Sequence, residues 1–269
     1  MKSKPYLGIS QNVLDVVRPL LDHGDSYHKV HKARLARTAH IVSDLVAEAG
    51  EGCKVLELGT SGFLPVTLKS LFPSVAIDVT EYEKSEDSNE VSVKQKDVGI
   101  ADKTATVTTF GLDLEYGALP VDDETYDIVI CCEVLEHMEI DPMFMLAEVN
   151  RVLKTGGKLM LTTPNILSSR AITKMVQGYE PYFFMQYHKS REYNRHNYEY
   201  SVKGLWAVLR CAGFDPTVWT EDLFEDPLPH TVDMLNYHGF KIANTGDNLL
   251  SIAPKISGVV ERHPRGLYV

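Results

Sequence analysis

The spacing of apolar residues predicts a helix near the N-terminus followed by a short buried strand. In residues 27–49, apolar and small side chains recur at helical intervals, and Gly50 is a natural end for the element. Residues 54–59 (KVLELG) form a short apolar run that ends in glycine, which is typical of a buried strand. We therefore expect an N-terminal helical segment over residues 1–50, with the first strand of a sheet directly after it.

Further apolar runs predict a sheet whose strands alternate with helices. The runs predicted as strands are residues 75–80, 107–113, 126–134, 158–164, 215–220 and 249–253. The stretches predicted as helices are Pro65 to Leu71, Pro142 to Leu153 and residues 202–212. Such alternation favours a parallel sheet with right-handed crossovers, and nearly continuous apolar strands fit a sheet covered on both faces. We predict an α/β fold with a doubly wound, mostly parallel, seven-stranded sheet.

Two stretches depart from this alternation. Residues 82–104 are rich in Glu, Lys, Asp and Ser, which predicts a surface loop or a frayed helix. Residues 166–200 contain many aromatic side chains, so they predict either a lid over a site or a plain packing insertion. The aromatic residues of this expected lid are Tyr179, Tyr182, Phe183, Phe184, Tyr187, Tyr193, Tyr198 and Tyr200.

Composition and charge narrow the class of partner. The chain has 269 residues, 44% of them hydrophobic and 24% charged, which suits one elaborated globular domain. Its formal net charge of -10 disfavours nucleic acid, because binding to nucleic acid depends on neutralising phosphates. A local basic cluster lies within residues 28–37, and it fits either one solvated face of a helix or an anion site.

The same sequence indicates a cytoplasmic protein without a membrane span. No apolar run is long enough to cross a bilayer, and the first residues lack the apolar stretch of a secretory signal. The four cysteines form no CxxC pair, so we expect buried free thiols rather than disulfides. These cysteines are Cys53, Cys131, Cys132 and Cys211.

Acidic residues follow successive strands at the edge where α/β sheets bind ligands. Glu57 precedes Gly59 and Ser61 after the first strand, and small residues there let the backbone approach a ligand. A carboxylate at this point suits a cationic ligand such as S-adenosylmethionine. Glu81, with Asp78 as the alternative, ends the second strand, where a carboxylate can accept both hydroxyls of a ribose.

The third strand adds a further acid at the same edge. Asp113 can accept a hydrogen bond from an adenine amino group, and Leu114 can cover the ring. A single acid of this kind is as common in solvated loops as in sites. Three acids at successive strand ends are a much less common coincidence, so we interpret them as one binding site.

Longer segments resemble a known family. Residues 55–63 (VLELGTSGF), 112–138, 148–165, 195–200 (RHNYEY) and 212–214 resemble, in order, the ubiquinone-biosynthesis O-methyltransferase type of class I S-adenosylmethionine-dependent methyltransferases. The resemblance implies a methyltransferase domain over residues 51–255, with the lid insertion at about 166–200, and a C-terminal tail over 256–269. One departure is that Gly59-Thr60-Ser61-Gly62-Phe63 replaces the family's GxGxG.

The resemblance also assigns roles to single residues. It implies that Glu57, Gly59 and Ser61 lie at the cofactor. It implies a ribose contact from Glu81. The remaining cofactor positions that it implies are Asp113, Leu114 and Glu133.

A second resemblance concerns a metal. Glu133, Glu136, His137 and the later His196 resemble the four side chains that hold a divalent metal in small-RNA 2′-O-methyltransferases. Two carboxylates and two imidazoles suit Mg, Mn, Fe, Co or Zn, and a metal lowers the pKa of a bound hydroxyl. His137 and His196 are accordingly the catalytic candidates. Two alternatives stay open, namely His137 as a base without metal and a purely structural role.

These features together predict a methyltransferase that acts on a hydroxyl of a small molecule or a glycan unit. An aromatic lid suits a sugar or a phenol, because aromatic faces stack on both. An RNA acceptor is disfavoured by the charge and by the lack of an RNA-binding domain. The alternatives are an N- or C-methyltransferase without metal, and a nucleotide-binding protein of the same fold without catalysis.

Overall fold

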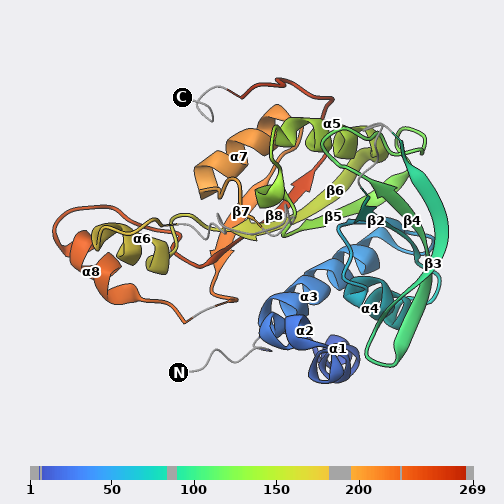
Figure 1. Ribbon diagram of the computed structural model, residues 1–269, viewed down its shortest axis with the longest axis horizontal. Helices are drawn as coiled ribbons and strands as arrows, with labels where there is room; N and C mark the ends of the chain where they lie inside the picture. The colour runs from blue at the N-terminus through green and yellow to red at the C-terminus, as the bar shows by residue number, and fades with distance from the viewer. Residues whose placement is uncertain (1–5, 7, 84–89, 182–194, 225, 265–269) are drawn as a thin grey trace.

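A central sheet organises the computed structural model, which describes residues 6, 8–83, 90–181, 195–224 and 226–264 (Figure 1). Its strands are β1 (Lys54–Leu58), β2 (Ala76–Tyr82), β3 (Ser92–Ile100), β4 (Lys103–Leu112), β5 (Tyr126–Cys132), β6 (Leu153–Pro164), β7 (Thr217–Glu221) and β8 (Asn248–Pro254). They follow the order β3-β4-β2-β1-β5-β6-β8-β7. The inner pairs from β4 to β6 are parallel, whereas β3, β8 and β7 pair in antiparallel fashion. The mostly parallel α/β fold is confirmed, with eight strands in the described residues where seven were predicted.

Helices cover both faces of the sheet, as the apolar strands require. The helices are α1 (Gln11–His23), α2 (Ser26–Val30), α3 (Lys32–Ala49), α4 (Phe63–Leu71), α5 (Pro142–Val152), α6 (Ser169–Val176), α7 (Val202–Cys211) and α8 (Pro229–Tyr237). Figure 1 shows α1 to α4 on one face and α5 with α7 on the other, and each layer has its own buried apolar cluster. Among the described residues, no helix has the length and apolarity needed to cross a membrane.

The polar stretch after β2 contains a strand, so the loop or frayed helix expected over residues 82–104 is wrong for its second half. β3 pairs along its whole length with β4 and forms one edge of the sheet. An edge strand has one open side, so it tolerates the exposed Lys94 and Lys96, while Val98 and Ile100 are buried. Charged residues on an edge strand mimic the composition of a surface loop, which explains the misassignment.

The helix predicted over residues 27–49 is divided at His31 into α2 and α3. The Asp25 side chain accepts a hydrogen bond from the backbone N–H of His28 and caps α2. The apolar spacing runs through both helices, so it predicted their joint extent and not the break. α2 packs against α1 and α3, and Arg34 in the first turn of α3 is buried.

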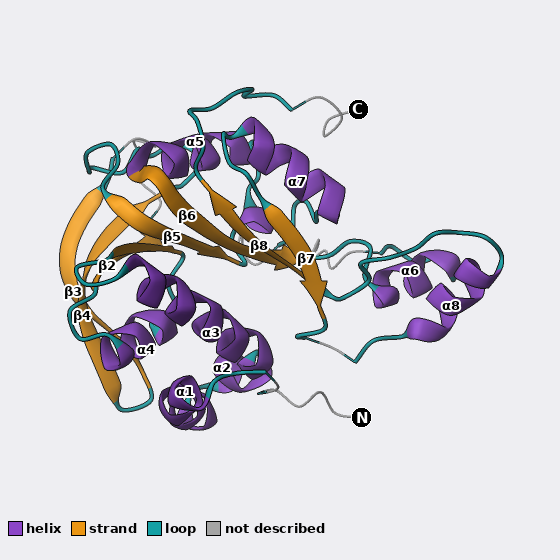
Figure 2. Cartoon of the chain, turned by 180° about the vertical axis from the view of Figure 1, so that it is seen from behind, coloured by secondary structure: helices purple, strands orange, loops and turns teal. Residues whose placement is uncertain are grey.

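The stretch predicted as an aromatic lid contributes one helix to a protruding pair. α6 packs against α8, and Figure 2 shows both helices projecting well beyond the sheet; we call this pair the helical arm. Tyr179 is exposed, while the rings of Tyr198 and Tyr200 contact each other at 4.8 Å. The described residues form no aromatic cluster, so that part of the expected lid is not found. Tyr182, Phe183, Phe184, Tyr187 and Tyr193 lie outside the described residues.

One asparagine joins the helical arm to the sheet. Asn165 follows β6, and its side-chain amide donates hydrogen bonds to the carbonyl oxygens of Asn244 (2.9 Å) and Gly246 (2.7 Å). Its backbone N–H donates to Asp247, and it bridges to Tyr200 where the chain returns. Outgoing and returning segments of the arm therefore meet at this one residue.

Candidate active site

A glycine turn closes the carboxyl end of β1. Gly59 and Gly62 both have positive φ angles, of 69° and 80°. A Cβ at Gly62 would lie 2.6 Å from the carbonyl oxygen of Gly99, so no other residue fits against β3 there. The Gly59 N–H donates to the Thr80 hydroxyl at 3.0 Å, which ties the turn to β2. The tight turn that the sequence predicted is therefore present and is fixed on two sides.

Beside this turn lies a cavity of about 390 Å³. It opens at the carboxyl ends of the parallel strands, and we call it the strand-end cavity. The predicted residues Gly59, Asp113, Leu114, Glu133 and His137 line it. Lining residues that the sequence did not single out are Thr80, Tyr82, Leu112, Glu115, Tyr116, Val134, Met138, Glu139 and Ile140.

Glu57 is buried beneath the glycine turn. One carboxylate oxygen, Oε2, has no hydrogen-bond partner among the described residues. Burial raises the pKa of this carboxyl to about 7, although a hydrogen bond with Thr60 acts in the opposite direction. Because a positive ligand would stabilise the ionised form, the environment fits the cationic partner that the sequence suggested.

The two candidate ribose acids are both engaged elsewhere. Both oxygens of the Glu81 carboxylate contact Lys96 Nζ on β3, at 2.6 and 2.7 Å. The Asp78 carboxylate accepts a hydrogen bond from the Tyr126 hydroxyl at 2.9 Å. Along β2 it is Thr80 and Tyr82 that line the strand-end cavity, so Glu81 points to the other face. The ribose role of Glu81 or Asp78 stays a prediction.

Glu133 holds a strained position directly after β5. It has a φ of 55°, which is unusual for a residue with a side chain. Its Oε1 accepts hydrogen bonds from Thr162 (2.8 Å) and Asn248 (3.1 Å), and its Oε2 lies 3.9 Å from Nε of the buried Arg34. Burial alone would raise its pKa, but Arg34 and these hydrogen bonds lower it. Glu133 is thus an ionised partner of Arg34.

Glu136 is buried in the 3-10 turn η1 (Leu135–His137) that follows β5. Its Oε2 accepts a hydrogen bond from the Thr163 hydroxyl at 2.9 Å. Its Oε1 has no hydrogen-bond partner among the described residues and lies 3.9 Å from His137 Nε2. Burial, followed by the charge of Glu133, raises the pKa of Glu136 well above its ordinary value. A cation near Oε1 would offset this cost.

Both histidines have their Nδ1 atoms fixed by acceptors. His137 Nδ1 lies 3.0 Å from the carbonyl oxygen of Arg195, and His196 Nδ1 lies 2.7 Å from Glu199 Oε1. Carbonyl and carboxylate oxygens only accept, so Nδ1 carries a proton in each ring, and the neutral tautomer with this hydrogen bond has its lone pair on Nε2. Burial lowers the pKa of His137, which favours its neutral form. This tautomer is the one in which an imidazole binds metal through Nε2.

These side chains meet at one point. Ligand atoms of Glu136, His137 and His196 all lie within 4.8 Å of one another, and the two rings are 5.2 Å apart. Backbone bonds hold the two segments together, since the Asn197 N–H donates to the Glu136 carbonyl at 2.7 Å. Glu133, the fourth predicted ligand, is not part of this group. We call the three residues the carboxylate–histidine cluster.

The two arginines of the basic stretch near the N-terminus are paired with acidic side chains. Arg37 forms a two-pronged ion pair with Glu221, at 2.8 to 3.1 Å. Arg34 donates to the Tyr27 hydroxyl at 2.9 Å and faces Glu133. These arginines are therefore not part of an open anion site, and they connect α3 to Glu133 after β5 and to Glu221 of β7, while Lys29 is exposed to solvent.

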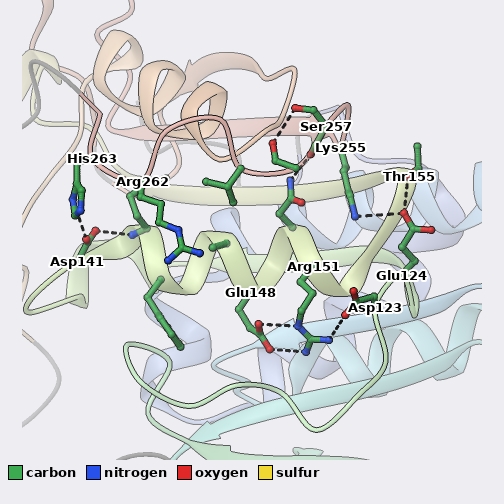
Figure 3. Close-up of a pocket in the computed structure, with 16 residues that line it drawn as sticks. Asp123, Glu124, Asp141, Glu148, Arg151, Thr155, Lys255, Ser257, Arg262 and His263 are labelled. Atoms are coloured by element: carbon green, nitrogen blue, oxygen red, sulfur yellow. Dashed lines mark hydrogen bonds and ion pairs between the residues drawn. The ribbon is translucent and has the colours of Figure 1, made fainter.

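A second, larger hollow of about 1070 Å³ lies beside α5 and the C-terminal residues (Figure 3). Several of its charged side chains are paired with one another, as Figure 3 shows for Arg151 between Glu148 and Asp123. Lys255 donates to the Leu153 carbonyl and faces Glu124. None of the predicted site residues lines this hollow, so the candidate chemistry belongs to the strand-end cavity.

Comparison with known proteins places the chain in a family. Residues 30–218 match the model of a family described as a methyltransferase domain. A search of curated proteins found no match.

Solved structures with a similar fold are distant in sequence. One is an S-adenosylmethionine-dependent methyltransferase of Thermotoga maritima, described as a possible histamine N-methyltransferase. It is 18% identical, with a TM-score of 0.52, over 90% of this chain and 99% of that chain. The CMeT domain of the citrinin polyketide synthase is 14% identical, with a TM-score of 0.51, over 84% of this chain and 53% of that chain. Similarity at this level of identity shows the fold alone.

Proposed function

The chain belongs to the methyltransferase-domain family, and from this premise we propose that it transfers a methyl group from S-adenosylmethionine to a hydroxyl group, assisted by a divalent cation. The proposed acceptor is a hydroxyl of a small molecule or a glycan unit. The observation that carries the proposal is the carboxylate–histidine cluster, because His137 belongs both to this cluster and to the lining of the strand-end cavity.

The chemistry of the three side chains fits a metal. The buried Glu136 Oε1 has no hydrogen-bond partner among the described residues, and a cation would compensate that atom. Each imidazole directs its protonated Nδ1 to an oxygen acceptor, the usual support for a metal-binding histidine. One carboxylate and two imidazoles leave room for an acceptor oxygen. When bound, the cation would lower the pKa of that hydroxyl and replace a strong base.

The protein side chains divide the remaining work. Glu57 and Gly59 would hold the amino-acid end of the cofactor, and Asp113 with Leu114 the adenine. Glu133 keeps Arg34 neutralised beside the cavity wall. Glu136, His137 and His196 would hold the acceptor oxygen in line with the methyl group, which is the alignment that this displacement requires.

Cobalt binding tests the cluster without any acceptor. We expect one Co²⁺ per chain with the absorption of histidine-bound cobalt. Glu136→Gln and His196→Ala should each weaken binding by at least about tenfold. His230→Ala on α8 is the matched control, since His230 is exposed and outside the cluster. Equal cobalt binding by wild type and both cluster variants would remove the metal from the proposal.

Methyl transfer tests the reaction itself. Labelled S-adenosylmethionine is incubated with hydroxyl-rich glycan and small-molecule extracts, using chelated protein and protein with single metals restored. We expect methyl transfer to a hydroxyl group, and we expect this transfer to require the metal. Full activity of the metal-free protein and of His196→Ala would favour the alternative, an N- or C-methyltransferase or transfer with His137 as a simple base.

A further inference from the structure

We propose that Glu115 is a positioning residue that holds the two walls of the strand-end cavity in register for the cofactor. The inference rests on the proposed function, because it takes this cavity as the place where S-adenosylmethionine binds. Glu115 is not among the residues that the sequence patterns singled out. Its role follows from the hydrogen bonds of its carboxylate.

The Glu115 carboxylate accepts hydrogen bonds from three consecutive backbone N–H groups. Oε1 accepts from Ile140 at 2.6 Å and from Asp141 at 3.0 Å. Oε2 accepts from Glu139 at 2.9 Å. These donors lie between η1 and α5, in a segment that belongs to neither a strand nor a helix. A negative charge suits this place, because it precedes the N-terminus of α5.

These bonds join two segments that both line the cavity. One wall is formed by residues 112–116 after β4, and the other by residues 133–140 after β5. The backbone of Glu115 belongs to the first wall, and its carboxylate binds the backbone of the second wall. The second wall begins with Glu133 and includes His137, so the same bonds fix the segment that leads from the carboxylate–histidine cluster.

The turn that aims Glu115 is itself fixed by Asp113. The Glu115 N–H donates to Asp113 Oδ1 at 3.0 Å, and the Gly117 N–H donates to the Asp113 carbonyl at 2.8 Å. Asp113 is the proposed acceptor for the adenine amino group. One tight turn therefore positions both the Asp113 carboxylate, proposed to bind the ligand, and the Glu115 carboxylate, which binds the backbone of the second wall.

The geometry sets an order among substitutions. Glu115→Ala removes all three hydrogen bonds and frees the segment 139–141. Glu115→Gln retains an oxygen that can accept from Ile140 and Asp141, but its amide NH₂ then meets the Glu139 N–H, and two donors repel. A pre-formed cavity binds more tightly than one that must be ordered by the ligand. We therefore expect cofactor affinity in the order wild type, Glu115→Gln, Glu115→Ala.

The test measures S-adenosylhomocysteine binding by calorimetry, together with hydrogen exchange of the ligand-free proteins. We expect the dissociation constant to rise at least about tenfold in Glu115→Ala and about threefold in Glu115→Gln. Exchange at the amides of residues 139–141 should accelerate in the same order. Glu124→Gln is the matched control, because its carboxylate accepts from Thr155 at 2.6 Å at the opposite edge of the sheet.

The outcomes separate the two proposals. Binding of S-adenosylhomocysteine to Glu115→Ala with wild-type affinity, despite faster exchange at 139–141, would overturn the positioning role and leave the proposed function intact. Absence of binding to the wild-type protein would overturn the proposed function and this inference together. A uniform loss of stability with unchanged affinity in both Glu115 variants would also count against positioning.

Discussion

At the scale of single residues, buried charges without complete partners concentrate at the carboxyl edge of the sheet. Glu57 and Glu136 each have a buried oxygen with no hydrogen-bond partner among the described residues, and Arg34 likewise has a buried Nε. Buried polar groups in this condition are costly in a ligand-free protein, and they mark the places where a ligand or ion adds stability. Each of them can be tested alone.

Glu57 should make cofactor binding depend on pH. Its pKa of about 7 in the free protein means that it is largely protonated below that value. The cationic cofactor favours the ionised form, so binding releases a proton and strengthens as pH rises. We expect the affinity for S-adenosylmethionine to increase about tenfold between about pH 6 and about pH 8. Calorimetry across this range should show that Glu57→Gln flattens the dependence; an unchanged slope would assign it to another group.

Arg34 should be more costly to remove alone than together with its partner. Arg34→Met leaves the buried Glu133 carboxylate without its cation, which we expect to lower the free energy of unfolding by about 3 kcal/mol. The double variant Arg34→Met/Glu133→Gln should recover part of this loss, because the uncompensated charge is gone. Urea unfolding measures both. If the double variant is as unstable as the sum of the single ones, the two side chains are not coupled.

At the scale of elements, the turns between strands and helices position the site as much as the strands do. The turn after β1 lies against β3, because Gly62 faces Gly99 of that strand. β3 lies in a stretch whose polar composition predicted a surface loop or a frayed helix. The edge strand therefore supports the residues that lead into the strand-end cavity.

Gly62→Ala should reveal this contact. The positive φ of Gly62 costs an alanine about 1 kcal/mol, and the overlap with the Gly99 carbonyl adds a further 1 to 3 kcal/mol, roughly. Gly52→Ala is the control, since Gly52 has a similar φ of 78°, in a turn closed by the bond from the Cys53 N–H to the Gly50 carbonyl, but a methyl group added there would meet no described atom within 4 Å. Thermal unfolding should therefore show the larger loss for Gly62→Ala. Equal losses would mean that β3 yields to the added methyl group.

Sequence periodicity predicted the buried strands well and the edges poorly. β1, β2, β5 and β6 are apolar because helices cover them on both faces, so their composition reports their place. β3 is an edge strand with many exposed charged residues, so its composition does not indicate that it pairs with β4. At the site, Asp113 and His137, which the sequence placed at strand ends, line the cavity, but along β2 the alternation of side chains brings Thr80 and Tyr82 to it instead of Glu81. The role of Glu115 could not be predicted from the sequence, because its hydrogen-bond partners are backbone N–H groups, which every residue other than proline has.

At the scale of the whole molecule, hydrogen bonds around Asn165 and Asp247 join the sheet to the helical arm in the described part of the chain. The arm projects from the edge that carries the candidate site, and the segment that supplies His196 returns to the sheet near Asn165 (Figure 1). At this junction Asn165 donates hydrogen bonds to the carbonyl oxygens of Asn244, Gly246 and Asp247. The position of the arm relative to the sheet should therefore depend strongly on one side chain.

Asn165→Ala should loosen the arm without unfolding the sheet. It leaves the carbonyl oxygens of Asn244 and Gly246 without their donor, a loss of about 2 kcal/mol or more for partly buried groups. Hydrogen exchange should accelerate in α6 and α8 while the amides of β5 keep their protection. Faster exchange in β5 to the same extent would show that arm and sheet unfold as one cooperative unit.

The junction at Asn165 also bears on how such a chain can change over generations. The segments that build the arm leave the sheet and rejoin it at the same edge, so insertions or deletions within them leave the strand order and register untouched. The insertion or deletion of one residue inside β1 before Glu57, by contrast, would turn the Glu57 side chain to the opposite face of the sheet. The arm can therefore vary in length while the strands that lead to Glu57 and the strand-end cavity keep their order and register.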